Sequence, residues 1–307
     1  MYYPYLRGRQ FELIALREFA VEKGFKNNVV PIIEPVKNSF NSIKLAIPKL
    51  FENNVRFGIV LNPIVGENKN SFVNFTELRE ILTGNDSWIP VYIIQNNYDS
   101  IASKIEEFGH HEVMIVLTDT ADTSSPELIK FIQNSPIKYV LSKENRTLKR
   151  LLPKNIELIR LDDNFNAQKR NKDYLSMAEE KFSEEHLFYK EDGYAGFSDY
   201  TVLVSDFIEG GSLPYAVAIH LTYAKPNNEV WIKHFTSITN DDQSNIQRKF
   251  AEAAKKAVLF IENKNISNSA VNELREYYND GEGTYPGLGV VKKISIKNHL
   301  ELINDLL

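Results

Sequence analysis

Residues 89–118 read IPVYIIQNNYDSIASKIEEFGHHEVMIVLT, and this stretch decides the fold. Two short apolar runs, residues 89–94 and 113–118, flank a polar run at 100–108 in which apolar residues recur at helical spacing. The apolar runs lack polar alternation, which is typical of parallel strands that helices cover on both faces. The stretch therefore predicts a strand, a helix and a second strand parallel to the first.

The same alternation continues along the first half of the chain. Strands are predicted at residues 2–6, 29–34, 57–61, 89–94, 113–118, 138–142 and 157–161, and helices at 10–23, 39–51, 72–82, 100–108, 126–133 and 145–151. Ser39 and Ser125 are predicted to cap helices, Ser125 with a proline after it. An eighth strand is expected at 194–201, after a charged helical stretch near residues 173–185.

Strands and helices in this order form either an open doubly wound sheet or a closed barrel, because each crossover connection is right-handed. The eighth strand favours closure. We therefore predict an α/β fold of the (β/α)8, TIM-barrel type.

The pattern changes after residue 212. Residues 215–223 and 230–235 predict a β-hairpin, and residues 243–262 and 270–278 predict helices, the first with an apolar stripe. The glycine-rich residues 281–289 predict a surface loop, since they lack the Gly-Lys-Ser/Thr of a phosphate loop, and a terminal segment follows at 296–306. We predict one domain over 1–307, in which 212–307 elaborates the barrel.

Composition bounds the classes of function. The chain has 307 residues, 43% hydrophobic and 25% charged, which suffices for a large core. A net charge of -5 argues against a globally basic surface for nucleic acid, although a local groove can still be positive. The absence of cysteine excludes disulfides, thiol nucleophiles and cysteine-ligated metals. Without a secretory signal pattern or a membrane-spanning run, we expect a cytoplasmic protein with no membrane partner.

Polar side chains follow the predicted strands, and in parallel α/β folds the ligand site lies beyond the carboxyl ends of the strands. These residues are Arg7, Arg9, Glu34, Lys37, Asn62, Asp119, Lys143, Asp162, Asp163 and Asp199, and His220 closes the first hairpin strand. For any one of these residues, solvation or capping of the next helix would also explain a polar side chain at the end of a strand. His110 and His111 precede a strand, at the opposite end.

Glu34 directly follows a buried strand, where an unpaired charge would be expensive. Arg7, Arg9 or Lys37 could neutralise it as a structural partner; alternatively, Glu34 could hold a cation, orient a ligand or act as a base with a raised pKa. Arg7 and Arg9 flank Gly8 before a predicted helix, which suits a phosphate or carboxylate ligand as well as a simple salt bridge.

Residues 196–200 are a second candidate site. Strand alternation puts Ser198 and Tyr200 on one face and Asp199 on the other, so the three cannot all line one pocket of a regular strand. In the hairpin, opposed strands are expected to bring His220 and His234 together, where each is either a hydrogen-bonded structural residue or a ligand or base.

Residues 3–16 (YPYLRGRQFELIAL), 31–35 (PIIEP) and 196–200 (GFSDY) resemble the bacterial and phage beta-protein family. The chain looks like the branch that is often encoded beside a small nuclease-like partner, and the similarity extends to 216–223, 231–235 and 298–300. The resemblance implies a mobile-element or phage-defence setting, and it names no catalytic residue. Matching residues that also stand out on chemical grounds are Arg7, Arg9, Glu12, Glu34, Asp199 and His220.

The leading hypothesis is a component of such a system that binds a phosphorylated ligand or nucleic acid at the carboxyl ends of the strands. If it is an enzyme, we expect a metal-assisted hydrolase of the phosphodiesterase or nuclease type. Catalysis would fall to Glu34, Asp199 and His220, and ligand binding to Arg7, Arg9, Lys37, Asn62, Lys143 and Asp162. A carboxylate-rich site without cysteine favours Mg²⁺ or Mn²⁺.

Two alternatives remain open from the sequence. One is a non-catalytic protein-binding or immunity partner that retains the barrel as a scaffold, since fold alone does not decide function. The other is sugar processing by Glu34 and Asp199 as paired carboxylates.

Overall fold

The computed structural model describes residues 1–69, 71–73, 75–210, 215–278 and 283–307. Contacts within the chain divide it into two compact units. Unit 1 comprises Met1–Arg9, Gly24–Asp163 and Phe188–Tyr200, and unit 2 comprises Gln10–Lys23, Asn164–Leu187 and Thr201–Leu307. The single domain expected from the sequence stays a prediction.

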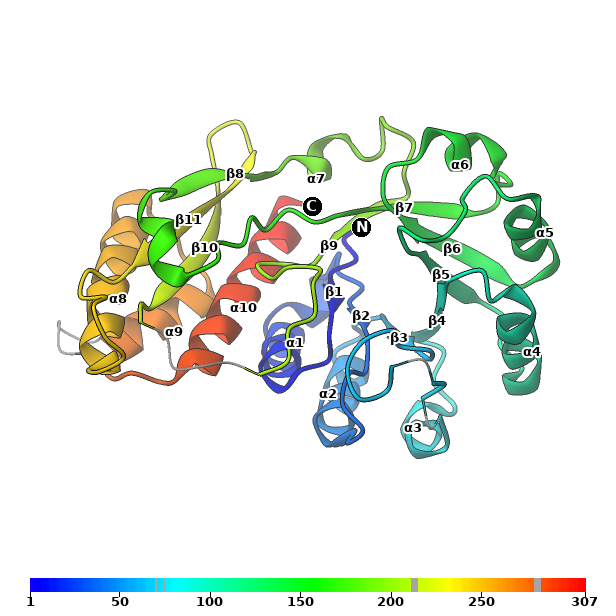
Figure 1. Ribbon diagram of the computed structural model, residues 1–307, viewed down its shortest axis with the longest axis horizontal. Helices are drawn as coiled ribbons and strands as arrows, with labels where there is room; N and C mark the ends of the chain where they lie inside the picture. Colours follow the sequence, from blue (N-terminus) through cyan, green and yellow to red (C-terminus); the bar gives the residue numbers. More distant parts are fainter. Residues whose placement is uncertain (70, 74, 211–214, 279–282) are drawn as a thin grey trace. The chain divides into compact units, whose positions relative to one another are not determined.

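Unit 1 contains an eight-stranded parallel sheet (Figure 1). Its strands, in spatial order, are β1 (Tyr5–Leu6), β2 (Ile32–Ile33), β3 (Phe57–Val60), β4 (Trp88–Ile94), β5 (Val113–Leu117), β6 (Ile137–Ser142), β7 (Glu157–Asp162) and β9 (Gly196–Asp199). Just before β1, Tyr2 forms parallel bridges with both Val29 and Phe197, and the Tyr3 N–H donates to the Phe197 carbonyl at 2.8 Å. The last strand thus meets the first, which confirms the predicted barrel and excludes the open sheet.

Closure requires a glycine at the start of β9. A Cβ atom on Gly196 would lie 2.5 Å from the Tyr3 ring and 2.8 Å from the Met1 carbonyl oxygen. Any larger residue would push β9 away from the N-terminal strand, so Gly196 fixes the seam of the barrel.

The barrel interior is filled by alternate residues of the strands, as expected when one face of a closed sheet points inward. This cluster contains Tyr3, Tyr5, Val30, Ile32, Val60, Ile89, Val91, Ile93, Met114, Val116, Tyr139, Leu141, Ile159 and Leu161. The rings of Tyr3 and Tyr139, from opposite sides of the barrel, have centroids 6.4 Å apart, so the cluster spans the lumen. Burial of each such side chain contributes about 1.5–3 kcal/mol.

The predicted helices between strands are present in unit 1 as α2 (Asn41–Glu52), α3 (Phe75–Leu82), α4 (Tyr98–Phe108), α5 (Pro126–Asn134) and α6 (Arg146–Leu151). Ser125 caps α5 as predicted, because its hydroxyl accepts from the backbone N–H groups of Glu127 and Leu128. Ser39 is not a cap, however: the N-cap position of α2 is Phe40, and α2 starts at Asn41, two residues later than predicted.

Unit 2 contains the predicted hairpin, β10 (Ala218–Ala224) and β11 (Val230–Thr236), and a third strand, β8 (Glu179–Ser183), pairs antiparallel with β11. The prediction of a helix near 173–185 is therefore wrong. That segment forms a short 3-10 helix, η2 (Asn171–Leu175), then β8 and the start of α7 (Glu185–Phe188). Pairing with β11 makes residues 179–183 a strand and not a helix. Glu179 lies opposite Lys233 and accepts from its Nζ at 2.8 Å.

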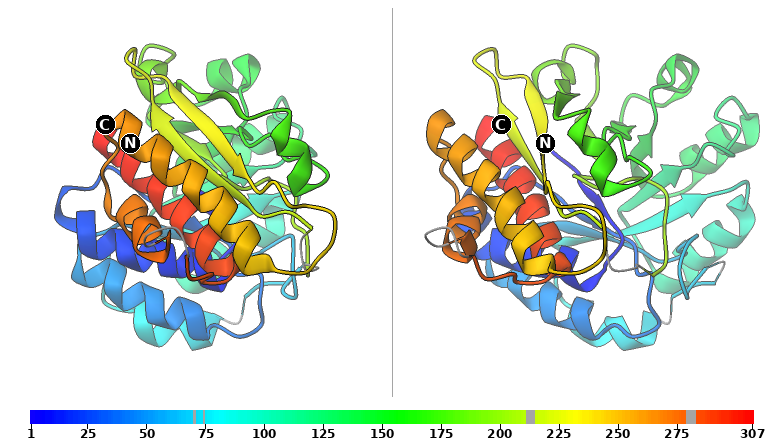
Figure 2. Two further views of the ribbon diagram at one scale, coloured as in Figure 1. Left: turned by 90° about the vertical axis from the view of Figure 1, so that its left-hand side faces the viewer. Right: turned by 60° about the vertical axis from the view of Figure 1, so that its left-hand side comes forward.

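Helices α1 (Gln10–Lys23), α8 (Ile246–Lys264), α9 (Ser269–Tyr278) and α10 (Leu288–Leu306) complete unit 2. The predicted stripe of α8 is buried at Phe250, Ala254, Val258 and Ile261. Figure 2 shows α8 and α10 lying along the hairpin. Because α10 begins at Leu288, the helix is longer than the predicted terminal segment, and the last two residues of the predicted 281–289 loop belong to it. Residues 74, 212–214 and 279–282 of the predicted segments lie outside the described residues.

Candidate functional site at the barrel mouth

The barrel mouth, meaning the carboxyl ends of the strands of unit 1, carries a buried charged pair. Glu34 follows β2 and is fully buried. Its Oε2 accepts from the Tyr5 hydroxyl at 2.8 Å and from Arg7 Nη1, and its Oε1 accepts from the Ile64 backbone N–H at 2.9 Å. Three donors from two segments, β1 with its end and the stretch after β3, thus converge on one carboxylate. Of the partners that the sequence suggested for Glu34, Arg7 forms the ion pair.

The Arg7 guanidinium lies beside two aromatic rings that also contact each other, with their centroids 5.3 Å apart. Its Cζ is 5.1 Å from the centroid of the Tyr5 ring and 5.4 Å from that of Tyr200, a distance at which cation–π attraction operates. Burial alone would lower the pKa of Arg7, but Tyr5 and Glu34 outweigh it and raise that pKa. The Arg7 side chain remains 13% exposed. Arg7 is therefore a fixed positive charge at the edge of the mouth.

Gly8 allows the chain to pass Glu34 at close range. Its φ is +61°, in the left-handed region, and a Cβ atom would lie 3.0 Å from the Glu34 carbonyl oxygen. A glycine adopts this conformation without the penalty that other residues meet. The Arg7-Gly8-Arg9 sequence thus brings the Arg7 side chain next to Glu34.

The last barrel strand divides its polar residues between two faces, as alternation predicted. Tyr200 packs against the interior cluster, and the Ser198 hydroxyl donates to the Tyr3 carbonyl at 2.5 Å. Burial raises the pKa of the Tyr200 phenol to about 12, against the opposing effect of Arg7. Tyr200 therefore stays a neutral hydroxyl beside the guanidinium.

Asp199 and Asp162 lie on the other face of the sheet, where they are register partners. Asp199 is buried and accepts from the Tyr2 hydroxyl, while Arg160 Nε lies 2.9 Å from an Asp162 carboxylate oxygen. Burial raises the pKa of Asp162, and Arg160 opposes that shift. The barrel wall thus separates these two carboxylates from Arg7 and Glu34.

Other predicted residues have partners of their own. Asn62 extends the pairing of β3 with β4, because its amide donates to the Ile93 carbonyl and accepts from the Ile93 N–H, both at 2.8 Å. Lys37 is exposed and donates to Glu67 at 2.8 Å. Arg9 is the last residue of the Met1–Arg9 segment of unit 1 and is partly exposed.

Lys143 and Asp119 lie in a small cavity of about 180 Å³ at the ends of β5 and β6. Lys143 Nζ donates to Asp119 at 2.7 Å, and both side chains are more than half exposed. A second carboxylate, Glu144, also lines the cavity, together with Leu117, Thr118, Ala121, Thr123, Ser142 and Asn145. This cavity is polar and belongs to the same end of the barrel as Arg7.

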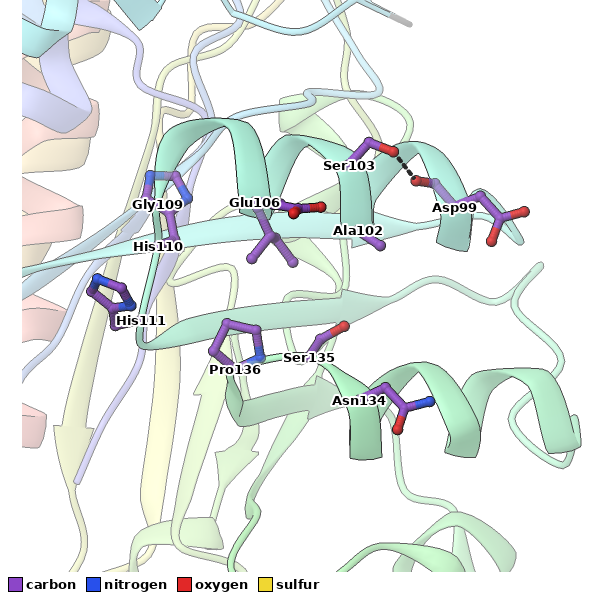
Figure 3. A pocket seen from close by; sticks show the side chains of 11 residues that line it. Asp99, Ala102, Ser103, Glu106, Gly109, His110, His111, Asn134, Ser135 and Pro136 are labelled. Atoms are coloured by element: carbon purple, nitrogen blue, oxygen red, sulfur yellow. Dashed lines mark hydrogen bonds between the residues drawn. The ribbon is translucent and has the colours of Figure 1, made fainter.

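A larger cavity of about 590 Å³ lies at the opposite end of β5 (Figure 3). His110 and His111 line it beside Gly109, as their place before β5 predicted. The His110 ring pairs with the Tyr92 hydroxyl at 3.1 Å, and burial lowers its pKa to about 4, with a smaller contribution from His111. A neutral, hydrogen-bonded imidazole is consistent with a structural role there.

His220 belongs to unit 2, so its predicted role at the barrel mouth stays a prediction. The expected meeting of His220 and His234 is confirmed, since they are register partners on β10 and β11. In the described part of the chain, His, Asp and Glu side chains do not gather into any group of three that could hold a metal ion. The carboxylates expected to bind Mg²⁺ or Mn²⁺ are divided between the two faces of the barrel wall.

Sequence reasoning missed two contributors to the site. Tyr5 holds Glu34 and flanks Arg7, and its position two residues before Arg7 on the same strand face could have revealed it. The Ile64 N–H comes from the segment after β3, and no side-chain pattern marks a backbone donor.

Comparisons with known proteins add little. No protein-family model matches the chain, and no curated protein matches it. The crystal structure of the Bacillus cereus spore cortex-lytic enzyme SleL is similar to it at a TM-score of 0.33 and 10% identity, over 98% of this chain and 73% of that chain. The evidence for the barrel is therefore the pairing of its eight strands. Within the described residues, the helices are all too short or too polar to cross a bilayer.

Proposed function

We propose that unit 1 binds a phosphorylated ligand at the barrel mouth and that Arg7 is the principal anion-binding group. The observation that carries the proposal is the fixed guanidinium of Arg7, which is 13% exposed, paired with Glu34 and packed beside the rings of Tyr5 and Tyr200. A planar guanidinium matches phosphate geometry, and a group that is already immobilised loses little entropy on binding. Ligands of barrels of this type bind at the same end of the strands.

Glu34 acts in this proposal as a positioning residue for Arg7. Both of its carboxylate oxygens already accept hydrogen bonds, from Tyr5, Arg7 and Ile64. A general base needs an oxygen directed at its substrate. The geometry therefore supports binding better than hydrolysis.

Lys143 is a candidate for a second contact, because it lies in a polar cavity at the same end of the strands. Its ion pair with Asp119 is exposed and therefore weak, so an incoming phosphate could replace Asp119 as its partner. Ligands with two phosphate groups, or a nucleic-acid strand, would suit both contacts.

The phage-defence or mobile-element setting, with a nuclease-like protein partner, belongs to the proposal through the resemblance of residues 3–16, 31–35 and 196–200 to the beta-protein family. The alternative, an immunity partner that binds only protein, predicts no affinity for phosphate.

Calorimetric titration with pyrophosphate and with a short single-stranded oligonucleotide tests the proposal. Arg7→Gln combined with Glu34→Gln removes the buried pair without leaving one charge alone. Lys49→Gln combined with Glu52→Gln is the matched control, since it removes an exposed ion pair of the same net charge from α2. We expect the first double variant to lose affinity at least about tenfold and the control to keep it. Equal binding by both variants, with both folded by circular dichroism, would contradict the proposal.

A further inference from the structure

Unit 2 contains a cavity of its own, about 220 Å³ in volume. It lies among η2, β10 and α10, with polar groups from Asn171, His220, Lys292 and Ser295 and with apolar walls from Val202, Leu203, Ala218, Leu288 and Val291. The volume is below the roughly 300–1,000 Å³ of pockets for drug-sized ligands. The cavity therefore suits a small molecule with a few polar groups.

The histidine in this cavity is bonded to a second histidine. His220 and His234 face each other across β10 and β11, and their Nδ1 atoms are 2.7 Å apart. In a hydrogen bond between two neutral rings, one Nδ1 must donate and the other must accept. The direction of this bond decides which nitrogen of His220 carries a lone pair.

Glu180 on β8 sets that direction. Its Oε1 lies 3.5 Å from His234 Nε2, and within the described residues both atoms are buried and make no hydrogen bond by strict geometry. A proton on His234 Nε2, directed at the carboxylate, satisfies both atoms at once. His234 Nδ1 then accepts, His220 Nδ1 donates, and His220 Nε2 is left with its lone pair.

Aromatic rings enclose the pair. The Tyr174 ring centroid is 4.7 Å from that of His220 and 4.5 Å from that of His234, and the Phe165 centroid is 5.1 Å from that of His220. Burial lowers the pKa of His220 to about 3, with further lowering by His234 and Lys292, and burial lowers the pKa of His234 to about 4. Both rings are thus neutral near pH 7.

We propose that this cavity binds a small hydroxylated anion, with His220 Nε2 accepting a hydrogen bond from the ligand hydroxyl and Lys292 facing its negative charge. The lining supplies both elements of this recognition, an imidazole acceptor and an ammonium group, within one small enclosure. Glu180 and His234 are positioning residues, because they act on the ligand only through the tautomer of His220. The site is independent of the phosphate site proposed for unit 1.

The tautomers test the first half of the proposal. In the full chain labelled with ¹⁵N-histidine, two-dimensional NMR at pH 7 should show His220 protonated at Nδ1 and His234 protonated at Nε2. His220→Gln and His234→Gln assign the two signals, and His111→Gln serves as a control at an exposed histidine. Glu180→Leu should abolish the preference of His234 for the Nε2–H form. The opposite tautomers in the wild-type chain would overturn the proposal.

Lactate and propanoate test the second half, since they match in charge and nearly in size and differ by one hydroxyl. We expect lactate to shift the His220 Nε2 signal with saturation at millimolar concentration and propanoate to bind at least tenfold more weakly. Lys292→Gln should weaken lactate binding and leave the tautomers unchanged. If neither anion perturbs His220, or both perturb it equally, the proposed ligand class is wrong.

Discussion

The barrel mouth of unit 1 and the histidine cavity of unit 2 both bury titratable side chains, but they satisfy them in different ways. Glu34 is buried as one half of an ion pair with Arg7, and further donors come from Tyr5 and Ile64. His220 and His234 are buried as neutral rings that bond to each other. The first arrangement depends on both partners being present, whereas the second depends on pH.

Breaking the charged pair should have the largest effect. Arg7→Gln leaves the Glu34 carboxylate buried without its counter-charge, so we expect a loss of about 3–5 kcal/mol in the free energy of unfolding, measured with urea. Arg7→Gln combined with Glu34→Gln should recover most of that loss. A single variant as stable as the double variant would show that Glu34 does not depend on Arg7.

Breaking the neutral pair should cost less. His234→Leu removes the hydrogen-bond partner of the His220 Nδ1–H, and an unsatisfied polar group of this kind costs about 1–3 kcal/mol. The same urea measurement applies. A loss as large as that of Arg7→Gln would remove the distinction between the two regions.

The pH dependence of stability sharpens the comparison. The folded-state pKa values of His220 and His234 lie at about 3 and 4, below the ordinary 6.5, so between about pH 4 and 6.5 the unfolded chain binds more protons. The free energy of unfolding should therefore fall as pH drops below 6.5, by up to about 1.4 kcal/mol per pH unit for each histidine.

His110 and His186 also have lowered pKa values, so the contribution of the pair needs a difference measurement. His220→Gln combined with His234→Gln should flatten the slope between pH 6.5 and 5, with Glu180, Tyr174 and Lys292 left in place around the site. An unchanged slope would mean that the two rings do not stay neutral in the folded chain.

The smallest effect is expected at the exposed ion pair of Lys37 and Glu67. Both side chains are about half exposed, and pairs of this kind contribute 0–1 kcal/mol. Lys37→Gln should lower the free energy of unfolding by less than about 0.5 kcal/mol, also by urea titration. A loss above about 2 kcal/mol would show that this exposed ion pair contributes as much to stability as a buried pair such as Arg7 and Glu34.

Much of the fold and of the two buried sites could be predicted from the sequence, where residues close together in the chain carry the signal. Apolar runs and helical spacing predicted the barrel, and the place of Glu34 after a buried strand predicted a cationic partner. Strand alternation predicted the separation of Asp199 from Ser198 and Tyr200, and hairpin pairing predicted the meeting of His220 and His234.

What the sequence could not predict depends on contacts between distant segments. β8 was taken for a helix because its charges show no strand pattern, and its partner β11 lies about fifty residues later in the chain. Glu180 was missed with it. Arg7, Arg9 and Lys37 were equivalent as partners of Glu34 until the register of β1 and β2 put Arg7 beside the carboxylate.

Anion binding by unit 1 depends most on Arg7 as the group that contacts the anion. Side-chain NMR of the full chain labelled with ¹⁵N-arginine measures this directly, and the signal lost in the Arg7→Gln, Glu34→Gln double variant identifies Arg7. On addition of pyrophosphate, the Arg7 signal should shift and saturate while those of exposed arginines stay nearly constant. Shifts spread over the exposed arginines, with the Arg7 signal unmoved, would contradict the account.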